Sequence, residues 1–253
     1  MNQTDMQHFS MGVWTLAVAY ATSVIGSLMG LSCASRARRE PAPRKKVLWT
    51  VLGALAIGGV AIWLMHFIAM LGFAVTDSPV RYSVPLTALS AVVAVLVVGI
   101  GLSMITFGRF GVPRLVLAGV IAGVGVAFMH YLGMAALEFQ GEISYDPVLA
   151  AVSVVLAVAA ATAALWCTVR VRSTAARTGS GLLLAVAVTG MHYTGMAGVA
   201  VTVDSSGPAP TGADVFDLVF PVFVISGLII AGLLWALFTS LVEPLATERA
   251  PTG

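Results

Sequence analysis

One six-residue pattern, Met-His-aromatic-x-small-Met, occurs three times in this 253-residue chain. Its copies are Met65–Met70, Met129–Met134 and Met191–Met196, and their histidines stand 64 and 62 residues apart. Imidazole nitrogen and thioether sulfur form a soft, neutral ligand set, which suits copper, especially Cu(I), better than magnesium, calcium or manganese. The same set excludes zinc and haem iron less decisively. The repeat therefore predicts a metal site, with copper as the best chemical choice and haem as a weaker one.

If each copy is helical, its histidine and second methionine lie four residues apart on one face. The first methionine projects about 100° away, so we interpret it as a packing residue whose flexible side chain still leaves metal binding open. Two copies carry a tyrosine after the histidine, and the first carries Phe67. The histidine and the second methionine of each copy are therefore candidate ligands of one shared site, and these residues are His66, Met70, His130, Met134, His192 and Met196.

The elements that must position these residues are predicted from composition. Apolar residues make up 59% of the chain and charged residues 9%, whereas soluble domains carry about 25% charged residues. A bilayer-spanning helix needs about 20 apolar residues, and the chain offers seven such stretches. We therefore predict an all-α integral membrane protein with no room for a soluble catalytic domain, and no enzyme activity. The predicted spans are 12–34, 47–71, 84–106, 115–137, 147–169, 181–203 and 218–241.

The distribution of basic residues predicts how these spans are oriented. Three alternate loops hold eleven Lys and Arg residues, and the other three together hold only Arg81. Because basic loops stay in the cytoplasm, we expect a plasma-membrane protein with residues 1–11 as a flexible extracytoplasmic tail and 242–253 as a cytoplasmic tail around a membrane domain at 12–241. His8 lies in the first tail. The eleven basic residues are Arg36, Arg38, Arg39, Arg44, Lys45, Lys46, Arg109, Arg114, Arg170, Arg172 and Arg177.

The motifs fall on every second span, so all three helices run from the cytoplasm outward. Asp77, Glu138 and Asp204 follow the three histidines by 11, 8 and 12 residues. At about 1.5 Å per residue, each imidazole then lies at most roughly 12 to 18 Å below the outer charged boundary. A single intramembrane histidine is more often a packing residue. Three at one depth favour a shared site, because polar side chains in lipid turn toward the bundle interior.

Other chemistries fit the sequence less well. Cys33 and Cys167 stand alone, far apart in the sequence, so they provide neither a disulfide framework nor a CxxC site. The net charge of +2 indicates no nucleic-acid partner, because positive loops beside membrane spans account for it. A retinal protein needs a Schiff-base lysine within the bundle, and Lys45 and Lys46 lie in a predicted cytoplasmic loop.

The three copies of M-H-[YF]-x-[GA]-M in a seven-span unit resemble the MHYT domain family of bacterial membrane sensors. The resemblance covers nearly the whole chain, about residues 12–241, and Phe67 departs from the family's tyrosine in the first copy. It implies a plasma-membrane domain whose Met, His and Tyr residues hold copper near the outer face and which senses oxygen, carbon monoxide or nitric oxide. The resemblance assigns candidate metal contacts to Met65, His66, Met70, Met129, His130, Met134, Met191, His192 and Met196. It makes Tyr131 and Tyr193 candidate cofactor-binding residues, for which a purely structural role is equally open. Family members often carry cyclic-di-GMP signalling domains after the last span. Here the chain ends about 12 residues after it, so we expect the signal to pass to a separate cytoplasmic or membrane partner.

Three functions are therefore weighed. The first is a copper-dependent gas or redox sensor, and the second is a transporter of metal or small molecules with the same ligands. The third is an intramembrane enzyme or haem electron carrier, in which two histidines would be axial ligands. Ion-driven transporters commonly carry charged intramembrane residues and broken helices. These spans hold no Asp, Glu, Lys or Arg, and the ligands gather at one depth rather than along a path, which favours the sensor.

Overall fold

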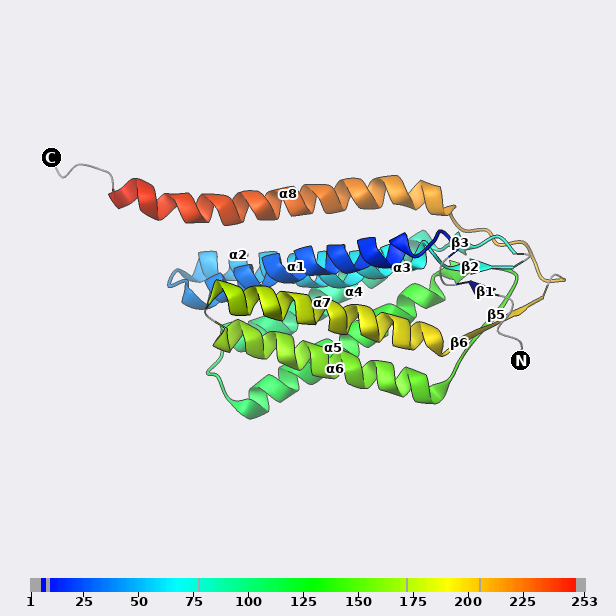
Figure 1. Cartoon of the computed structure of the whole chain (residues 1–253), viewed down its shortest axis with the longest axis horizontal. Coiled ribbons are helices and arrows are strands. Elements are labelled where there is room, and N and C mark those ends of the chain that lie inside the picture. Colours follow the sequence, from blue (N-terminus) through cyan, green and yellow to red (C-terminus); the bar gives the residue numbers. More distant parts are fainter. Residues whose placement is uncertain (1–5, 8–9, 77, 172, 205, 249–253) are drawn as a thin grey trace.

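The structure is a computed structural model that describes residues 6–7, 10–76, 78–171, 173–204 and 206–248. Long helices run nearly side by side along the molecule, and short strands gather at one end (Figure 1). The helices are α1 (Trp14–Arg39), α2 (Pro43–Ala54), η2 (Leu55–Leu64), α3 (Met65–Met70), α4 (Val84–Thr106), α5 (Val112–Ala135), α6 (Pro147–Arg170), α7 (Thr174–Ala197) and α8 (Val215–Glu248). Because α2, η2 and α3 follow one another without a break, they form one long helix.

The prediction of an all-helical membrane domain is confirmed at the level of its helices. Six helices, including the composite Pro43–Met70, are long and apolar enough to cross a bilayer. Helix α7 lies where the sixth span was predicted, but it does not reach the same apolarity, because its first turns carry Thr, Ser, Gly and Arg177. The seventh crossing therefore stays a prediction, as does the orientation in the membrane.

Two predicted boundaries are wrong. Helix α1 continues through Arg39, so three arginines assigned to a loop extend from its last turn, where cations also favour the negative end of the helix dipole. The predicted span 181–203 ends too late. Helix α7 stops at Ala197, and the β-branched run Val199–Val203 forms strand β6 instead. Hydropathy alone does not distinguish such a run from the end of a span, because valine is apolar in both structures.

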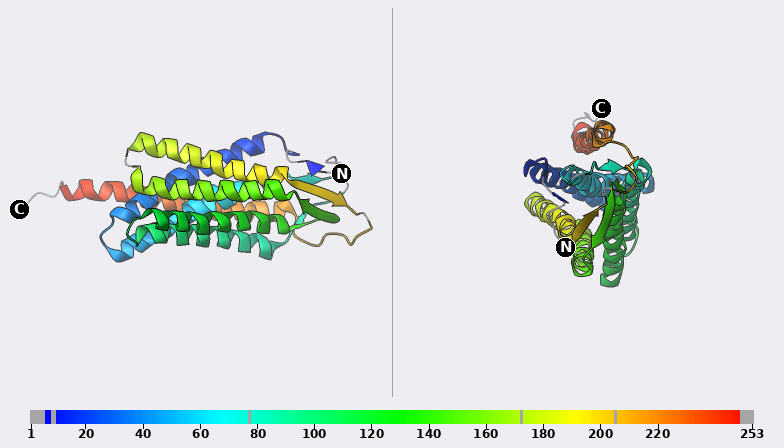
Figure 2. Two further views of the ribbon diagram at one scale, coloured as in Figure 1. Left: turned by 90° about the horizontal axis from the view of Figure 1, so that it is seen from below. Right: turned by 90° about the vertical axis from the view of Figure 1, so that its right-hand side faces the viewer.

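Six helical rods form a closed ring, and α8 lies outside it. Around the ring, α1 contacts α7 and η2, η2 contacts α4, and α5 and α6 complete the path between α4 and α7. Helix α8 has its main contacts with η2 and α1. The end-on view shows it apart from the other helices (Figure 2). The ring therefore consists of three helix pairs, and each pair contributes one motif-bearing helix.

A segment of π-helix precedes the first motif. Residues Leu55–Leu64 form η2, whose wider turns are closed by i→i+5 hydrogen bonds. Its glycines allow close packing: a Cβ on Gly58 would lie 2.6 Å from the carbonyl oxygen of Ala94 in α4, and one on Gly26 of α1 would collide with the backbone of Ala61. The backbones of α1, η2 and α4 consequently approach one another directly where they position His66.

Paired strands and polar contacts tie the loops together at the end where the motif helices finish. Strand β1 (Met6–Gln7) pairs with β2 (Ala74–Val75), β3 (Arg81–Tyr82) with β4 (Leu137–Glu138), and β5 (Gly141–Tyr145) with β6. Met6 and Gln7 are thus ordered, although a flexible tail was expected. His8, Asp77 and Arg172 lie outside the described residues.

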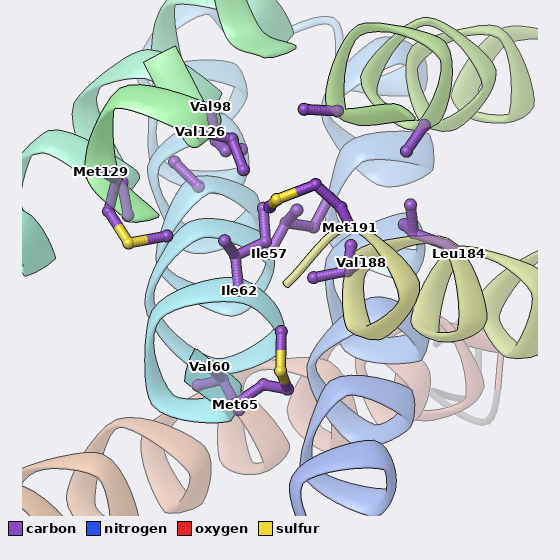
Figure 3. Close-up of a cluster of buried hydrophobic side chains, with 14 of the residues drawn as sticks. Ile57, Val60, Ile62, Met65, Val98, Val126, Met129, Leu184, Val188 and Met191 are labelled. Carbon is purple, nitrogen blue, oxygen red and sulfur yellow. The ribbon is translucent and has the colours of Figure 1, made fainter. Parts of the chain in front are cut away.

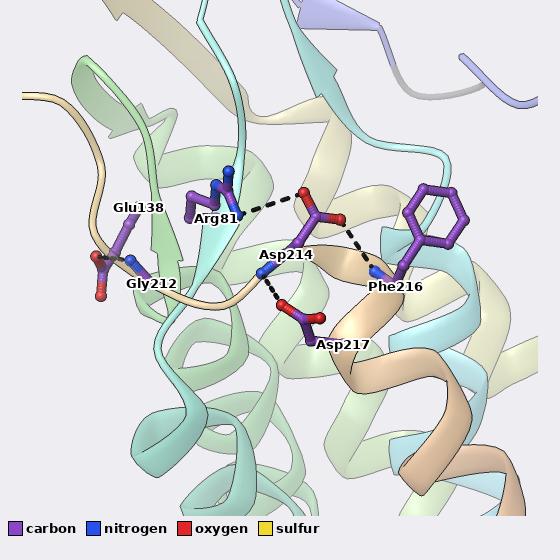
Figure 4. Close-up of polar contacts among 6 residues, drawn as sticks. All are labelled: Arg81, Glu138, Gly212, Asp214, Phe216 and Asp217. Atoms are coloured by element: carbon purple, nitrogen blue, oxygen red, sulfur yellow. Dashed lines mark hydrogen bonds and ion pairs between the residues drawn. The ribbon is translucent and has the colours of Figure 1, made fainter.

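The loop that precedes α8 contacts the strands at this end of the molecule. The guanidinium of Arg81 forms an ion pair with Asp214 at 3.4 Å, and Glu138 accepts a hydrogen bond from the backbone N–H of Gly212 at 3.0 Å (Figure 4). Burial, together with the charge of Asp214, raises the pKa of Tyr82 to about 12. The Tyr82 hydroxyl therefore stays neutral and donates a long hydrogen bond of 3.4 Å to the carbonyl of Met70, the last residue of the first motif.

Candidate metal centre

The three motif histidines meet in the interior of the ring. Their Nδ1 atoms are 3.1 Å apart between His66 and His192, and 3.3 Å apart in each pair that includes His130. All three are buried, with 5% of His66 and 1% of each other histidine exposed. Among the residues that the structure describes, these three histidines bring their potential ligand atoms within 4.8 Å of one another, close enough to hold a metal ion.

Three different helices supply the imidazoles, near the end of each helix. His66 lies in α3, His130 five residues before the end of α5, and His192 five residues before the end of α7. The rings stand edge to face, with centroids 5.0 to 5.1 Å apart. The prediction that the motifs occupy a similar depth is confirmed, because the histidines form one compact cluster.

Hydrogen bonding alone cannot satisfy all three Nδ1 atoms. In a neutral imidazole, each ring nitrogen is either an N–H donor or a lone-pair acceptor. A closed triangle of hydrogen bonds would need every Nδ1 to donate and accept at once, which no protonation pattern provides. Either two lone pairs or two N–H groups must face each other at about 3.1 to 3.3 Å. A cation between three lone pairs removes the conflict.

The size of the triangle fits a metal ion. Its centre lies about 1.9 Å from each Nδ1 atom, which is the mean side divided by √3, and a zinc–imidazole bond measures roughly 2.0 Å. An expansion of about 0.1 Å per histidine would therefore give ordinary bond lengths. His66, His130 and His192 would therefore hold the ion through their neutral Nδ1 atoms.

The six motif methionines divide between two apolar clusters on either side of the histidines. The first methionines belong to the large cluster in the middle of the ring, where their side chains lie among those of Ile57, Ile62, Val126 and Val188 (Figure 3). The second methionines belong to the cluster beneath the strands, with Phe73, Tyr82 and Val201. All six are buried, and the two sets are Met65, Met129 and Met191, and Met70, Met134 and Met196.

The motif tyrosines support the histidine rings rather than enclosing the centre. The rings of Tyr131 and Tyr193 each pack edge to face on the preceding histidine, with centroids 4.9 Å apart. The Tyr131 hydroxyl lies 2.8 Å from the hydroxyl of Ser153 in α6. Since Ser153 already donates to the carbonyl of Ala150, Tyr131 is the donor in this pair. The Tyr131 hydroxyl therefore donates its hydrogen bond to α6.

Two glycines of the motif receive the far edges of the imidazoles, a role that the sequence did not predict. A Cβ on Gly133 in α5 would collide with Nε2 of His66, and one on Gly195 in α7 would lie 2.6 Å from Nε2 of His130. Each of these histidines thus lies against the small residue of the next motif copy. The conserved spacing within the copies was a usable signal, because the small residue always stands three positions after the histidine.

Comparison with known proteins identifies the repeat. The family model described as a bacterial signalling protein N-terminal repeat, MHYT, matches residues 59–118 and 123–181, which contain the first two motif copies. The chain belongs to the MHYT family. The third copy follows the second matched segment and completes the histidine cluster. No solved structure matches the MHYT chain.

Curated relatives of this MHYT chain are signalling proteins. It is 36% identical over 222 residues to the bifunctional diguanylate cyclase/cyclic di-GMP phosphodiesterase MucR of Pseudomonas aeruginosa, an alignment covering 85% of this chain and 32% of MucR. It is also 36% identical to the cyclic di-GMP phosphodiesterase NbdA of the same organism, covering 75% of this chain and 25% of NbdA. The signaling protein YkoW of Bacillus subtilis is 31% identical over 60% of this chain and 20% of its own length. The chain thus spans about a third or less of these relatives.

Proposed function

We propose that this MHYT chain is a membrane sensor whose three motif histidines hold one copper ion and whose bound copper detects a diatomic gas or a change in redox state. The observation that carries the proposal is the buried triangle of Nδ1 atoms, which protonation cannot satisfy and a metal ion can. Bound copper would supply a centre able to change oxidation state or to accept a further small ligand.

The surroundings of the triangle support copper over the alternatives. Buried thioethers lie on both sides of the histidines, and soft sulfur ligands favour Cu(I). Three histidines alone also suit zinc, so the methionines distinguish the two metals. The Nδ1 atoms lie too close together for a porphyrin to fit between any two of the histidines. This spacing argues against haem.

The relatives support a signalling role. MucR and NbdA are named for the synthesis or hydrolysis of cyclic di-GMP. The part of each protein that aligns with this chain corresponds to the helical membrane domain described above. We propose that this chain is not itself an enzyme and that it signals through the cytoplasmic ends of its helices to a partner. Cross-linking in native membranes should recover a partner whose association changes with copper or oxygen.

Transport of metal is the second function that the ligands allow. A transport path needs successive binding positions across the membrane. In the described residues, the potential metal ligands converge at one level, and the cluster on the side of the histidines away from the strands is apolar. Copper uptake by liposomes containing the pure protein would establish transport, whereas a sensor retains its copper and moves none.

The decisive experiment is metal analysis of the detergent-purified protein and its single histidine variants. We expect about one copper per chain, and His66→Ala, His130→Ala and His192→Ala should each lower the occupancy far more than the control His8→Ala. Elution as a single folded species and an unchanged helical circular dichroism spectrum show that each variant is intact. Unchanged copper in all three variants would contradict the site, and loss in only two would reduce it to a two-helix site.

A further inference from the structure

An apolar cavity lies directly beside the histidine cluster, on the side away from the strands. It has a volume of about 40 Å³ and is enclosed by η2, α4, α5, α6 and α7. Ile62, Val126 and Val188, each four residues before a motif histidine, line it, as does Met191, the neighbour of His192. One helical turn is about 5.4 Å, so the cavity is separated from the histidines by about one layer of side chains.

The lining offers a bound molecule almost no polar contact. Thr168 provides the one hydroxyl among the lining residues, and this hydroxyl donates to the carbonyl of Leu165 at 2.7 Å. A buried water needs two to four polar partners, and apolar cavities consequently stay dry. A single water-sized molecule needs roughly 10 to 15 Å³ by the same measure. The cavity therefore has room for a small molecule but favours one that forms no hydrogen bonds.

The geometry points to a binding site for one small neutral apolar molecule, of the class of the diatomic gases, beside the metal centre. The identity of this natural occupant rests on the proposed gas-sensing function, whereas binding itself depends only on the shape and polarity of the cavity. Entry is from the hydrocarbon side, because Ala161 and Ala164 of α6 are the two lining residues that are only half buried. A gas dissolved in the bilayer would thus reach the centre without crossing the polar loops.

The wide turns of η2 help to form this cavity. Ile57 and Ile62, five residues apart, both line it, which is the spacing that i→i+5 turns bring onto one face. Opposite them, α6 contributes small side chains, including Ala157 and Ala160. Figure 3 shows Ile57, Ile62, Val126, Val188 and Met191 directed into the same interior region. Bulky groups on one wall and alanines on the other leave the space between them open.

Xenon is the probe, because it is apolar and binds dry cavities in proteins. Copper-free protein labelled with ¹³C at the methionine methyls is titrated with xenon gas and followed by NMR. We expect a saturable shift of the Met191 methyl, which lines the cavity, and a smaller one for Met65. Xenon dissolved in detergent should affect the exposed Met11 without saturation, which separates partitioning from binding.

Matched variants on α6 test the site. Ala160→Leu should fill the cavity and abolish the saturable shift, and Ala161→Leu replaces it if that variant does not fold. Ala163→Leu places the same group on the exposed face of α6 and should leave the shift unchanged. Val188→Ala should enlarge the cavity and strengthen the xenon response severalfold. Absence of a saturable Met191 shift, or its persistence in both filled variants, would overturn the inference. Because the protein is copper-free, a failure of the copper site would not affect this result.

Discussion

At the scale of single residues, the centre depends as much on glycine as on histidine. A histidine needs its Nδ1 atom at the centre, and the rest of the ring must then fit against a neighbouring helix. Gly133 and Gly195 provide that space for His66 and His130. The Nε2 atom of His130 has no hydrogen-bond partner among the described residues, so packing, rather than hydrogen bonding, positions this edge of the ring.

Adding one methyl group at Gly195 should therefore weaken metal binding. In Gly195→Ala, the new Cβ would lie 2.6 Å from Nε2 of His130, and the ring must move away from the centre. We expect at least a tenfold loss of copper affinity in a competition titration, together with destabilisation of about 1–3 kcal/mol from overpacking. Gly190→Ala on the same helix is the control, because a Cβ there meets nothing within 4 Å. Equal copper affinity in the two variants would contradict this role for Gly195.

The hydroxyl of Tyr131 should contribute to stability rather than to the metal. Its hydrogen bond to Ser153 joins α5 to α6, and the first motif copy carries Phe67, which has no hydroxyl, at the same position. Tyr131→Phe should lower the free energy of unfolding by about 0.5–1.5 kcal/mol, measured by thermal denaturation in detergent. Copper occupancy should stay at the level of the unchanged protein. A Tyr131→Phe variant that retains its stability but loses copper would instead assign the phenol to the site.

At the scale of elements, the π-helix determines how the first motif enters the ring. The tight contacts of Gly26 and Gly58 hold η2 against α1 and α4, and α3 with His66 follows η2 directly. The second and third motifs have no such segment before them, since α5 and α7 are regular helices. The three histidines therefore reach one centre from helices of different local geometry.

Adjacent glycines in η2 allow a matched test of this packing. A Cβ on Gly58 would lie 2.6 Å from the Ala94 carbonyl oxygen, whereas one on Gly59 would meet only the Val95 side chain at 3.6 Å. Gly58→Ala should therefore cost about 1–3 kcal/mol and lower the melting temperature in detergent, and Gly59→Ala should be nearly neutral. Equal melting temperatures would show that η2 relaxes away from α4 without cost.

The sequence predicted elements well where the signal was periodic or apolar, and poorly where packing decided. The spacing of the motifs was enough to place His66, His130 and His192 at one level, because every second helix runs in the same direction. The repeated small residue signals a need for space, but it does not identify the neighbour: that Gly133 lies against His66 depends on the rotation of each helix about its axis. Strand β6 and the π-helix were missed because their residues satisfy the apolar pattern of a span equally well.

At the scale of the whole molecule, three helix pairs form the ring and α8 adds an outer helix. This arrangement separates the two ends of the described chain. Strand β1 lies with the other strands beside the motif ends of the helices, and the last turns of α8 lie at the opposite end (Figure 1). An odd number of crossings produces this separation, which agrees with seven spans if α7 also crosses the bilayer.

The orientation in the membrane is the last prediction and decides which compartment the centre faces. Arg36, Arg38 and Arg39 lie at the end of α1 away from the strands, and basic segments beside spans stay in the cytoplasm. A fluorescent reporter fused after Glu248 should therefore be active in the cytoplasm. Alkaline phosphatase, which is active only outside, should work when inserted in the loop between β2 and β3 and fail after Glu248. The reverse pattern would place the histidine cluster near the cytoplasmic face, and the output surface would then have to be sought among the strands.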